Sequence, residues 1–308
     1  MRRLLILVAP IAAALWAAAP ARAAQAHWPI VGFGEQRPAV FTNSHWQGLG
    51  LPHTRLVVGW DALRYRWQTR EIDHWMDAAR QAGAIPLVAF SRSRAHWRTK
   101  LLPRARQYRR HFLRFRKRYP WVKDFVVWNE ANHCSQPLCH RPRKAARYFD
   151  EMRRSCWSCR IVAADVLDTS DMRAWLREFK HHAKYTPRIW GLHNYLDANY
   201  FRTSGTRTML ETVKGEIWFT ETGGLVHRTG ASPHRFRDSP SHAARAVRYL
   251  FRRIVPLSPR IKRVYLYHFQ NQGPEANWDS GVLDPNGRPR PAFDEVTRYL
   301  ARAERARQ

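Results

Sequence analysis

Short apolar runs alternate with longer amphipathic segments along most of this chain. The apolar runs are rich in β-branched and aromatic residues and predict strands over residues 30–35, 54–60, 84–90, 124–128, 160–166, 188–192, 216–220 and 263–269. Apolar residues at helical spacing predict helices over residues 71–82, 104–118, 144–154, 171–184, 206–213, 241–254 and 292–302. Each predicted strand is therefore followed by a helix or by a connection long enough to hold one.

This strict alternation predicts a parallel sheet. Eight such units in about 280 residues suit an α/β fold of the (β/α)8 or TIM-barrel type, which typically has about 250. An open doubly wound sheet needs fewer strands and usually a glycine-rich phosphate turn, and the sequence has neither G-x-G-x-x-G nor a Walker loop. No repeat or interdomain linker appears, so we predict a single-domain barrel over residues 27–308.

The first 26 residues have the layout of a secretory signal peptide. Residues 1–3 are basic, residues 4–20 are apolar, and two small-x-small sites follow, which predicts cleavage after Ala23 or Ala26. An uncleaved membrane anchor is the alternative, and Pro10 and the two cleavage sites disfavour it. No later stretch is apolar enough to span a bilayer, so we expect a secreted chain without a transmembrane span.

The four cysteines of the chain support the prediction that it is exported. They leave three disulfide pairings and a zinc site open, but an oxidising compartment favours disulfides. The two close pairs flank the predicted helix over residues 144–154, which favours the local bridges Cys134–Cys139 and Cys156–Cys159. A thioredoxin-type redox role for the C-x-x-C pair is disfavoured because no predicted strand immediately precedes it.

The chain is strongly basic, with 53 Lys+Arg against 24 Asp+Glu and a net charge of +29. Removing residues 1–26, which hold three arginines and no acid, would leave +26. The cations are mostly arginines dispersed on predicted helix faces, whereas nucleic-acid proteins concentrate them where phosphate binds. We therefore expect no specific nucleic-acid partner and a monomer, and keep electrostatic attachment to an anionic cell-wall polymer as a hypothesis.

Two predicted strands end in a glutamate. The strand over residues 124–128 is followed by Asn129-Glu130, and the strand over residues 216–220 by Glu221. In a barrel the chemistry lies at the carboxyl ends of the strands, so these two acids form a paired-carboxylate site. Cleavage of a glycosidic bond requires such a pair. The sequence has neither the G-x-S-x-G of a serine hydrolase nor the H-E-x-x-H of a zinc protease, and we predict no cofactor and no metal.

The motifs Trp128-Asn129-Glu130 and Phe219-Thr220-Glu221-Thr222-Gly223 resemble the signature strands of clan A of the glycoside hydrolases, near families 39 and 5. That resemblance implies a retaining enzyme on a (β/α)8 barrel that cleaves β-linked polysaccharides or oligosaccharides. It implies Glu130 as acid/base and Glu221 as nucleophile.

The same resemblance implies roles for further residues. Asn129 would hold the sugar 2-hydroxyl. His193-x-Tyr195 is similar to the strand-six element that orients the nucleophile through the tyrosine hydroxyl. Arg55 is similar to the strand-two arginine that keeps the nucleophile ionised.

Aromatic residues near the mouth are candidates for stacking on sugar rings. We favour Trp128 and Trp278 for this role. The eighth predicted strand lacks the tryptophan that often floors the reactive subsite in the clan, and Tyr267, Phe269 or Trp278 could replace it.

Weaker candidates and alternative functions remain. Glu35 ends the first predicted strand and Asp61 follows the second. Both could reach the cleft, although surface or structural roles suit them better. The chain could instead be a non-catalytic polysaccharide-binding barrel, or a basic protein that binds cell-wall or other anionic polymers.

Overall fold

Eight parallel strands close into a barrel in a computed structural model that describes residues 27–229, 239–271, 273 and 277–308. The strands are β1 (Ile30–Gly34), β2 (His53–Gly59), β3 (Ile85–Ser91), β4 (Asp124–Val126), β5 (Arg160–Leu167), β6 (Ile189–His193), β7 (Glu216–Thr222) and β9 (Ile261–Tyr267). Parallel pairing of β1 with β9, from Ile30 opposite Arg263 to Gly34 opposite Tyr267, closes the barrel. The predicted signal peptide lies outside the described residues.

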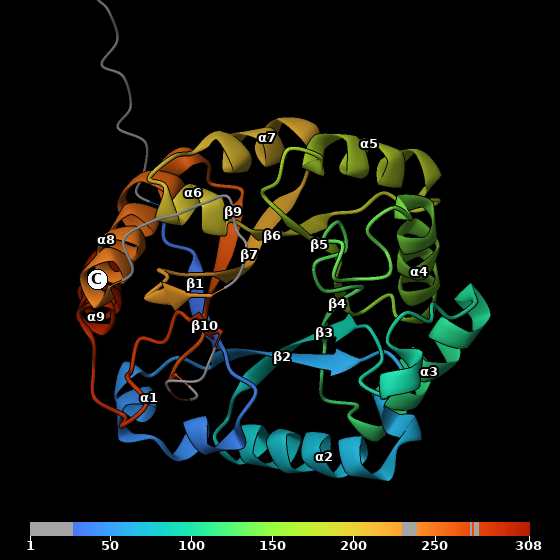
Figure 1. The fold of residues 1–308 in the computed structure, drawn as a ribbon, viewed down its shortest axis with the longest axis horizontal. Helices are drawn as coiled ribbons and strands as arrows, with labels where there is room; N and C mark the ends of the chain where they lie inside the picture. Colours follow the sequence, from blue (N-terminus) through green and yellow to red (C-terminus); the bar gives the residue numbers. More distant parts are fainter. Residues whose placement is uncertain (1–26, 230–238, 272, 274–276) are drawn as a thin grey trace, which may run out of the picture.

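Helices form a ring around the barrel (Figure 1). They are α1 (Ser44–Leu49), α2 (Arg66–Gln81), α3 (Ala105–Arg118), α4 (Pro142–Ser155), α5 (Met172–His182), α6 (Tyr195–Asn199), α7 (Ser204–Thr212), α8 (Pro240–Tyr249), which continues as a π-helical turn over Leu250–Ile254, and α9 (Pro291–Arg305). Proline opens α4, α8 and α9, where its missing N–H leaves no hydrogen bond unmade. Gly83, with φ +65°, follows the end of α2.

The core has two layers, as parallel strands buried on both faces require. The larger layer lies between the strands and the ring of helices, and aromatic residues such as Trp75, Phe112 and Phe125 fill it. The smaller layer fills the barrel interior with Leu87, Ala89, Val126, Val162, Ile189, Trp218 and Tyr265. The interior below the mouth is therefore packed, and only the carboxyl ends of the strands can hold a site.

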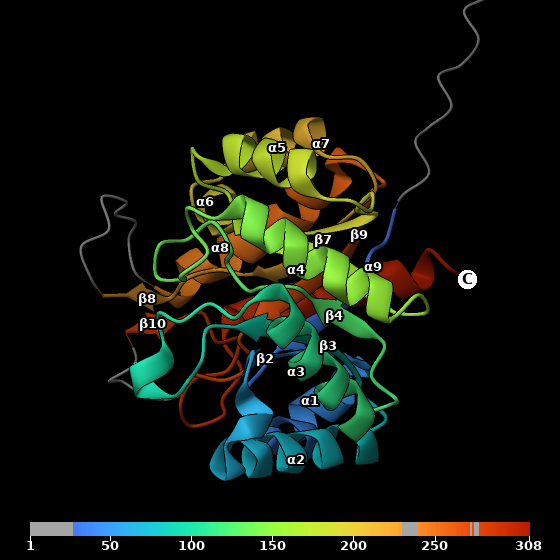
Figure 2. The ribbon, with the colours of Figure 1, turned by 90° about the vertical axis from the view of Figure 1, so that its right-hand side faces the viewer.

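The prediction of a (β/α)8 barrel is confirmed, with each predicted strand present within two residues of its expected ends. The structure also has short strands beyond the eight that the sequence predicts, one of them at Trp278. Trp278–Asp279 forms strand β10, which pairs antiparallel with β8 (His227–Arg228). The side view places this two-stranded sheet at one end of the barrel (Figure 2).

Both predicted disulfides are present. Cys134–Cys139 precedes α4 and Cys156–Cys159 follows it, so the two bridges lie at opposite ends of that helix. Within the described ranges, no helix combines the length and apolar character needed to cross a membrane.

Candidate active site

Glu130 lies on a tight turn directly after β4. Its backbone has φ +49°, in the left-handed region that non-glycine residues seldom adopt. Hydrogen bonds hold the backbone on both sides: the Asn129 N–H donates to the Phe90 carbonyl over 2.7 Å, and the Ala131 N–H to the Asp165 carbonyl over 2.8 Å. Strain of this kind persists where the surroundings determine it, and it concentrates at functional residues. The turn leaves the Glu130 side chain 23% exposed at the barrel mouth.

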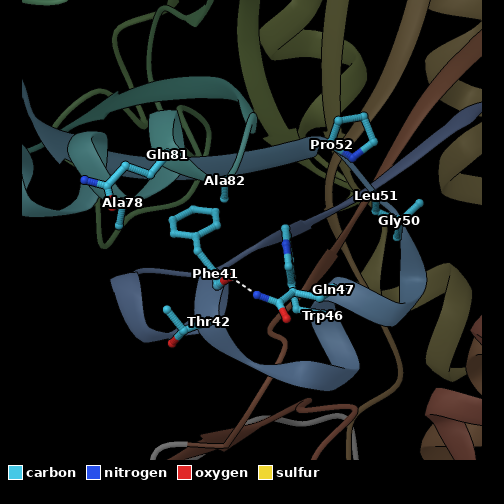
Figure 3. Close-up of a pocket in the computed structure, with 10 residues that line it drawn as sticks. All are labelled: Phe41, Thr42, Trp46, Gln47, Gly50, Leu51, Pro52, Ala78, Gln81 and Ala82. Carbon is cyan, nitrogen blue, oxygen red and sulfur yellow. Dashed lines mark hydrogen bonds between the residues drawn. The ribbon is translucent and has the colours of Figure 1, made fainter.

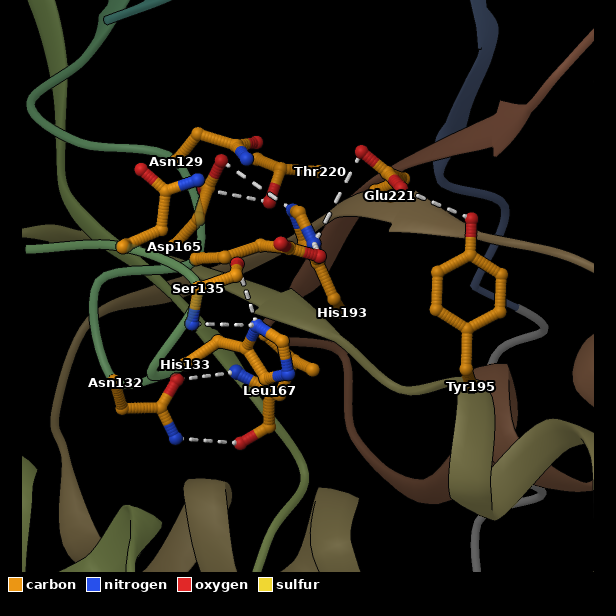
Figure 4. Close-up of polar contacts among 12 residues, drawn as sticks. Asn129, Asn132, His133, Ser135, Asp165, Leu167, His193, Tyr195, Thr220 and Glu221 are labelled. Carbon is orange, nitrogen blue, oxygen red and sulfur yellow. Dashed lines mark hydrogen bonds and ion pairs between the residues drawn. The ribbon is translucent and has the colours of Figure 1, made fainter. Parts of the chain in front are cut away.

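Glu221 is the sixth residue of β7, and two side chains hold its carboxylate. Arg55 Nη1 donates to Glu221 Oε2 over 2.7 Å, and the Tyr195 hydroxyl donates to Oε1 over 3.1 Å. Figure 4 shows the Tyr195 ring pointing its hydroxyl at this carboxylate. Both oxygens of Glu221 are thus fixed, while the group keeps 12% exposure.

The two predicted catalytic acids face each other. One carboxylate oxygen of Glu130 and one of Glu221 lie within 4.8 Å, and a ring nitrogen of His193 lies within the same distance of both. Glycosidases that proceed through a covalent intermediate have carboxyl groups about 5–5.5 Å apart, and inverting ones about 6.5–9.5 Å. The separation of the Glu130 and Glu221 oxygens lies nearer to the first range than to the second.

His193 ends β6 and is fully buried beneath the two glutamates. Its Nδ1 lies 3.4 Å from Glu130 Oε1, and its Nε2 lies 3.4 Å from Asp165 Oδ2. Burial alone would lower the pKa of His193, but the charge of Glu221 and the contacts with Asp165 and Glu130 outweigh it and raise the pKa to about 9. The ring is therefore an imidazolium at neutral pH.

This imidazolium acts on Glu130 in turn. Burial raises the pKa of the Glu130 carboxyl, but the hydrogen bond and the positive charge of His193 lower it by more, so the net shift is below the ordinary value. Glu130 consequently holds its proton best under acidic conditions.

Arg55 lies early in β2, yet its long side chain reaches the mouth while only 1% of the residue is exposed. Its Nη2 donates to Asn129 Oδ1 over 2.5 Å and to Asp165 Oδ2 over 2.9 Å, in addition to the Nη1 bond to Glu221. Burial opposes the charge of Arg55, but Asp165 and Glu221 raise its pKa above the ordinary value. The structure thus brings together all five polar residues predicted at this site besides Glu130, namely Arg55, Asn129, His193, Tyr195 and Glu221. Tyr195, expected on the sixth strand, is instead the first residue of α6.

Two polar residues of this region were not among the predicted ones. Asp165 sits inside β5, in an otherwise apolar run, and is fully buried. Asn132 binds the end of β5 through both side-chain atoms: its Oδ1 accepts from the Leu167 N–H over 2.8 Å, and its Nδ2 donates to the Leu167 carbonyl over 3.2 Å (Figure 4). Asp165 could have been identified from the sequence, because it is an acid within an apolar predicted strand. No pattern in the sequence singles out Asn132.

The two tryptophans predicted to stack on sugar rings differ in their exposure. Trp278 is half-buried beside the site, with its ring 4.8 Å from the Tyr195 ring and nearly perpendicular to it. Trp128 is fully buried in the outer layer against Tyr108 and Tyr148, so its ring cannot stack on a sugar. The side chain of Trp128, two residues beyond β4, lies on the helix side of the barrel against Tyr108 of α3 and Tyr148 of α4.

The two residues of the eighth predicted strand that were considered for the floor of the reactive subsite also differ in exposure. Phe269 is buried in the core against Phe33 and Trp46. Tyr267 is half-buried at the end of β9, and the charges of Glu221 and Glu35 add to burial in raising its pKa. Of these two aromatic residues, Tyr267 is therefore the one that lies near the two glutamates' end of the barrel.

Glu35 and Asp61 are buried acids with structural partners. Glu35 accepts hydrogen bonds from the side chain and backbone of Arg37 and from the Gln270 N–H, which ties the ends of β1 and β9 together. Asp61 pairs with Arg98 over 2.9 Å. These contacts give both acids bracing roles in the loops around the mouth.

The cluster of Glu130, His193 and Glu221 has a spacing that a metal ion could use. Both ring nitrogens of His193 face carboxylates, those of Glu130 and Asp165, so the cluster is internally paired as it stands. A second group, Cys134, Cys139 and His140, has its two sulfurs joined in a disulfide, so it offers no thiolate.

A hollow of about 500 Å³ lies outside this site (Figure 3). Phe41, Trp46 and Gln47 line one side of it, and Pro52 and Ala82 line the other. Pro52 precedes β2 and Ala82 follows α2, so the hollow lies toward the amino ends of the strands, away from the two glutamates.

Comparison with known proteins relates the chain to others through its fold. No family model matches the sequence, and no curated protein matches it. Similar solved structures include a family 39 glycoside hydrolase from Bacteroides cellulosilyticus WH2, with TM-score 0.58 and 13% identity over 88% of this chain. A monomeric beta-xylosidase from Caulobacter crescentus CB15 has TM-score 0.59 and 18% identity over 87% of this chain. Native xylanase 10B from Thermotoga maritima has TM-score 0.62 and 13% identity over 89%.

The matched lengths differ among these structures. The chain spans 63% of the family 39 structure and 66% of the beta-xylosidase, but 95% of the xylanase. At these identities the likeness concerns the backbone, and this chain has the (β/α)8 fold of these proteins.

Proposed function

We propose that this protein is a retaining glycoside hydrolase that cleaves β-linked polysaccharides or oligosaccharides. Glu221 is the nucleophile and Glu130 is the acid/base. The observation that carries the proposal is the pair of facing carboxylates at the barrel mouth, with one oxygen of Glu130 within 4.8 Å of one oxygen of Glu221.

The reaction takes two steps. In the first, a carboxylate oxygen of Glu221 bonds to the anomeric carbon, the glycosidic bond breaks, and Glu130 gives its proton to the departing oxygen. In the second, Glu130 takes a proton from a water molecule, the water oxygen bonds to the anomeric carbon, and Glu221 leaves as a carboxylate. Two inversions at one carbon retain its configuration.

Three features support these roles. Arg55 places a permanent positive charge against Glu221, which suits a nucleophile that must be ionised. His193 places a positive charge against Glu130, which stabilises the carboxylate left after proton donation. The similar structures that we cite are described as a glycoside hydrolase, a xylosidase and a xylanase, which agrees with the same chemistry.

Replacing Glu221 by alanine tests the assignment. The variant should lose turnover because it has no nucleophile, and added azide should restore cleavage of an activated β-glycoside and give an α-glycosyl azide. Substantial activity of the variant without azide would contradict the role of Glu221. Trp278→Ala is the matched control, since it alters the wall of the site and leaves the catalytic pair intact.

A non-catalytic polysaccharide-binding barrel is the alternative, and one incubation separates the two. Wild-type protein with β-glucan, xylan and mannan should release new reducing ends from at least one of them. Retention of the protein on a polymer without release of reducing ends would favour the binding protein.

We also propose that the chain is exported as a monomer after cleavage behind Ala23 or Ala26. The signal-peptide pattern and the two disulfides support export. Amino-terminal sequencing of protein from the culture medium should begin at Ala24 or His27, and a protein that retains residues 1–23 would contradict cleavage.

The basic surface suggests attachment of the exported protein to an anionic cell-wall polymer. Charge attraction of this kind weakens with salt because counterions screen it. Protein bound to isolated cell walls should therefore wash off as the salt concentration rises, and retention that is independent of salt would contradict the proposal.

A further inference from the structure

Asp165 is the one acid of the buried site that the proposed reaction does not use. It is fully buried in β5, and it accepts hydrogen bonds from Arg55 Nη2 over 2.9 Å and from the Thr220 hydroxyl over 2.6 Å. His193 Nε2 lies 3.4 Å from the same oxygen that Arg55 contacts. A buried carboxylate is costly unless it is paired and hydrogen-bonded, and this one is paired with two cations.

The barrel is shaped around this carboxylate. Gly191 of β6 lies opposite Asp165 in the pairing of β5 with β6. A Cβ atom at Gly191 would come within 1.9 Å of Asp165 Oδ1 and within 2.8 Å of Thr220 Oγ1. Only glycine leaves the room that the Asp165 carboxylate occupies.

The position of Asp165 separates two positive groups. Arg55 Nη2 lies 3.4 Å from His193 Nε2, and Asp165 Oδ2 contacts both. Without the acid between them, two buried cations at this distance would repel each other. Beyond Asp165, Arg55 reaches Glu221, and His193 reaches Glu130.

We propose that Asp165 is a positioning residue that acts through Arg55 and His193 on the two catalytic glutamates. This inference rests on the proposed function for its catalytic consequence. Asp165 touches neither glutamate side chain, so its effect passes through the arginine and the imidazolium that it holds in place.

Charge balance explains why the proposed reaction needs this acid. Arg55 and the His193 imidazolium carry two positive charges, and Asp165 supplies one fixed negative charge. The second negative charge lies on Glu221 before the reaction and on Glu130 once Glu221 is esterified. The buried set is thus neutral in both states, so no net charge is created in a site shielded from water.

The groups that face His193 come from four elements. They are Arg55 from β2, Glu130 from the turn after β4, Asp165 from β5 and Glu221 from β7. Asp165 and the two glutamates all favour the imidazolium, while Arg55 opposes it. Removing the charge of Asp165 therefore lowers the pKa of His193, and it leaves the site more positive around Glu130 at acidic pH, where His193 stays an imidazolium.

Asp165→Asn tests the inference, with Asp61→Asn as the matched control. Both acids are fully buried and paired with an arginine, but only Asp165 contacts His193. The pKa of the His193 ring, followed by NMR and assigned by its absence in His193→Gln, should fall by about one unit or more in Asp165→Asn. It should stay near its wild-type value in Asp61→Asn, and an unchanged pKa in Asp165→Asn would overturn the inference.

The kinetic measurement gives a second readout. On a substrate that the wild type cleaves, Asp165→Asn should lower kcat more than it changes KM. It should also move the alkaline limb of the pH profile to lower pH, because the loss of a negative charge lowers the pKa of Glu130 further. A loss of kcat with an unmoved pH profile would mean a merely structural role and would overturn the inference. If Asp165→Asn fails to fold, Thr220→Val removes one donor to Asp165 and leaves its charge in place. The carboxylate then interacts more strongly with its cationic partners, so the His193 pKa should rise, and no shift in a folded Thr220→Val would count against the coupling.

The NMR measurement needs no substrate, so the two proposals can fail separately. A chain without glycosidase activity whose His193 pKa still depends on Asp165 would contradict the proposed function alone. An active enzyme whose His193 pKa is the same in the wild type and in Asp165→Asn would contradict this inference alone.

Discussion

The environments of Glu130 and Glu221 differ in one respect that decides their chemistry. Glu221 contacts a permanently charged arginine and a hydroxyl donor, so both its oxygens are held by donors. Glu130 contacts only a titratable imidazolium, and at a longer distance of 3.4 Å. A group that must exchange a proton in each step needs a weaker and titratable partner, which supports the proposed role of Glu130 in proton transfer.

The assignment predicts the outcome of Glu130→Ala with azide. An activated aryl β-glycoside needs little acid assistance, so Glu221 should still form the covalent intermediate. Azide should then attack that intermediate and give a β-glycosyl azide, the opposite anomer from the product of Glu221→Ala. NMR of the product distinguishes the two, and an α-glycosyl azide from Glu130→Ala would exchange the two roles.

The position of His193 beside Glu130 predicts how activity depends on pH. Its positive charge lowers the pKa of Glu130, and the first step needs Glu130 protonated, so activity should be highest under acidic conditions and fall as pH rises. His193→Gln removes that charge, raises the pKa of Glu130 and should move the alkaline limb of kcat/KM to higher pH. Tyr195→Phe is the control, because Tyr195 binds Glu221: it should lower kcat roughly tenfold to a hundredfold and leave that limb in place. An alkaline limb at the same pH in His193→Gln would contradict the coupling.

The sequence predicted the residues whose chemistry interrupts an apolar pattern at a strand end. Glu130 and Glu221 are such residues, and so is His193. Asp165 interrupts a strand in its interior. In sequence, such an acid can mean either a buried ion pair or a wrongly predicted strand, and the pattern does not distinguish the two. Trp128 was wrongly expected at a sugar subsite because its face of the strand depends on the barrel geometry that the motif alone does not contain.

At the scale of elements, the short helix α6 carries Tyr195, and two buried acids hold it. Asp168 accepts from the backbone N–H groups of Leu196 and Asp197, at the start of α6. Asp197 in turn accepts from the N–H groups of Gly205 and Thr206, at the start of α7. The chain of acids fixes the helix from which Tyr195 reaches Glu221.

Asp168 predicts a pH dependence of stability. Burial raises its pKa to about 7, against an ordinary value of 3.8, so the folded protein retains a proton that the unfolded chain releases. That proton stabilises the fold at low pH, and the stabilisation is lost as pH rises through about 7. Asp168→Asn should therefore reduce the decline in the urea midpoint between pH 5 and pH 8. An identical decline in wild type and variant would contradict the prediction.

The elements that the sequence did not predict are short. Helix α6 has five residues, and β8 and β10 have two each, too few for a periodic pattern. Their conformations depend on partners distant in sequence, such as Asp168 for α6. The long helices and the barrel strands could be predicted because each is long enough to show a periodic pattern of apolar residues.

At the scale of the whole molecule, an ion cluster ties opposite sides of the barrel at the end away from the site. Asp124 of β4 accepts two hydrogen bonds from Arg160 of β5 and one, over 2.6 Å, from Arg263 of β9. The Arg263 guanidinium also lies 3.9 Å from the centre of the Trp218 ring in the interior layer. The cluster braces the barrel at the ends where its strands begin.

Asp124→Ala should lower the free energy of unfolding by about 3–5 kcal/mol, because it leaves the buried Arg263 without its partner. Denaturant unfolding measures this loss, and activity of the folded fraction should remain. Asp73→Ala is the control: its pair with Arg118 is largely exposed, so the expected loss is about 0–1 kcal/mol. Equal losses in the two variants would contradict the bracing role of the cluster.

The account rests on a covalent exchange between two carboxylates, and the stereochemistry of the product tests that exchange most directly. Wild-type protein should be incubated with a β-linked polysaccharide that it cleaves, and the first product should be followed by NMR before its anomers equilibrate. The account predicts that the β-anomer appears first. Initial release of the α-anomer, or binding of every polymer tried without any cleavage, would contradict it.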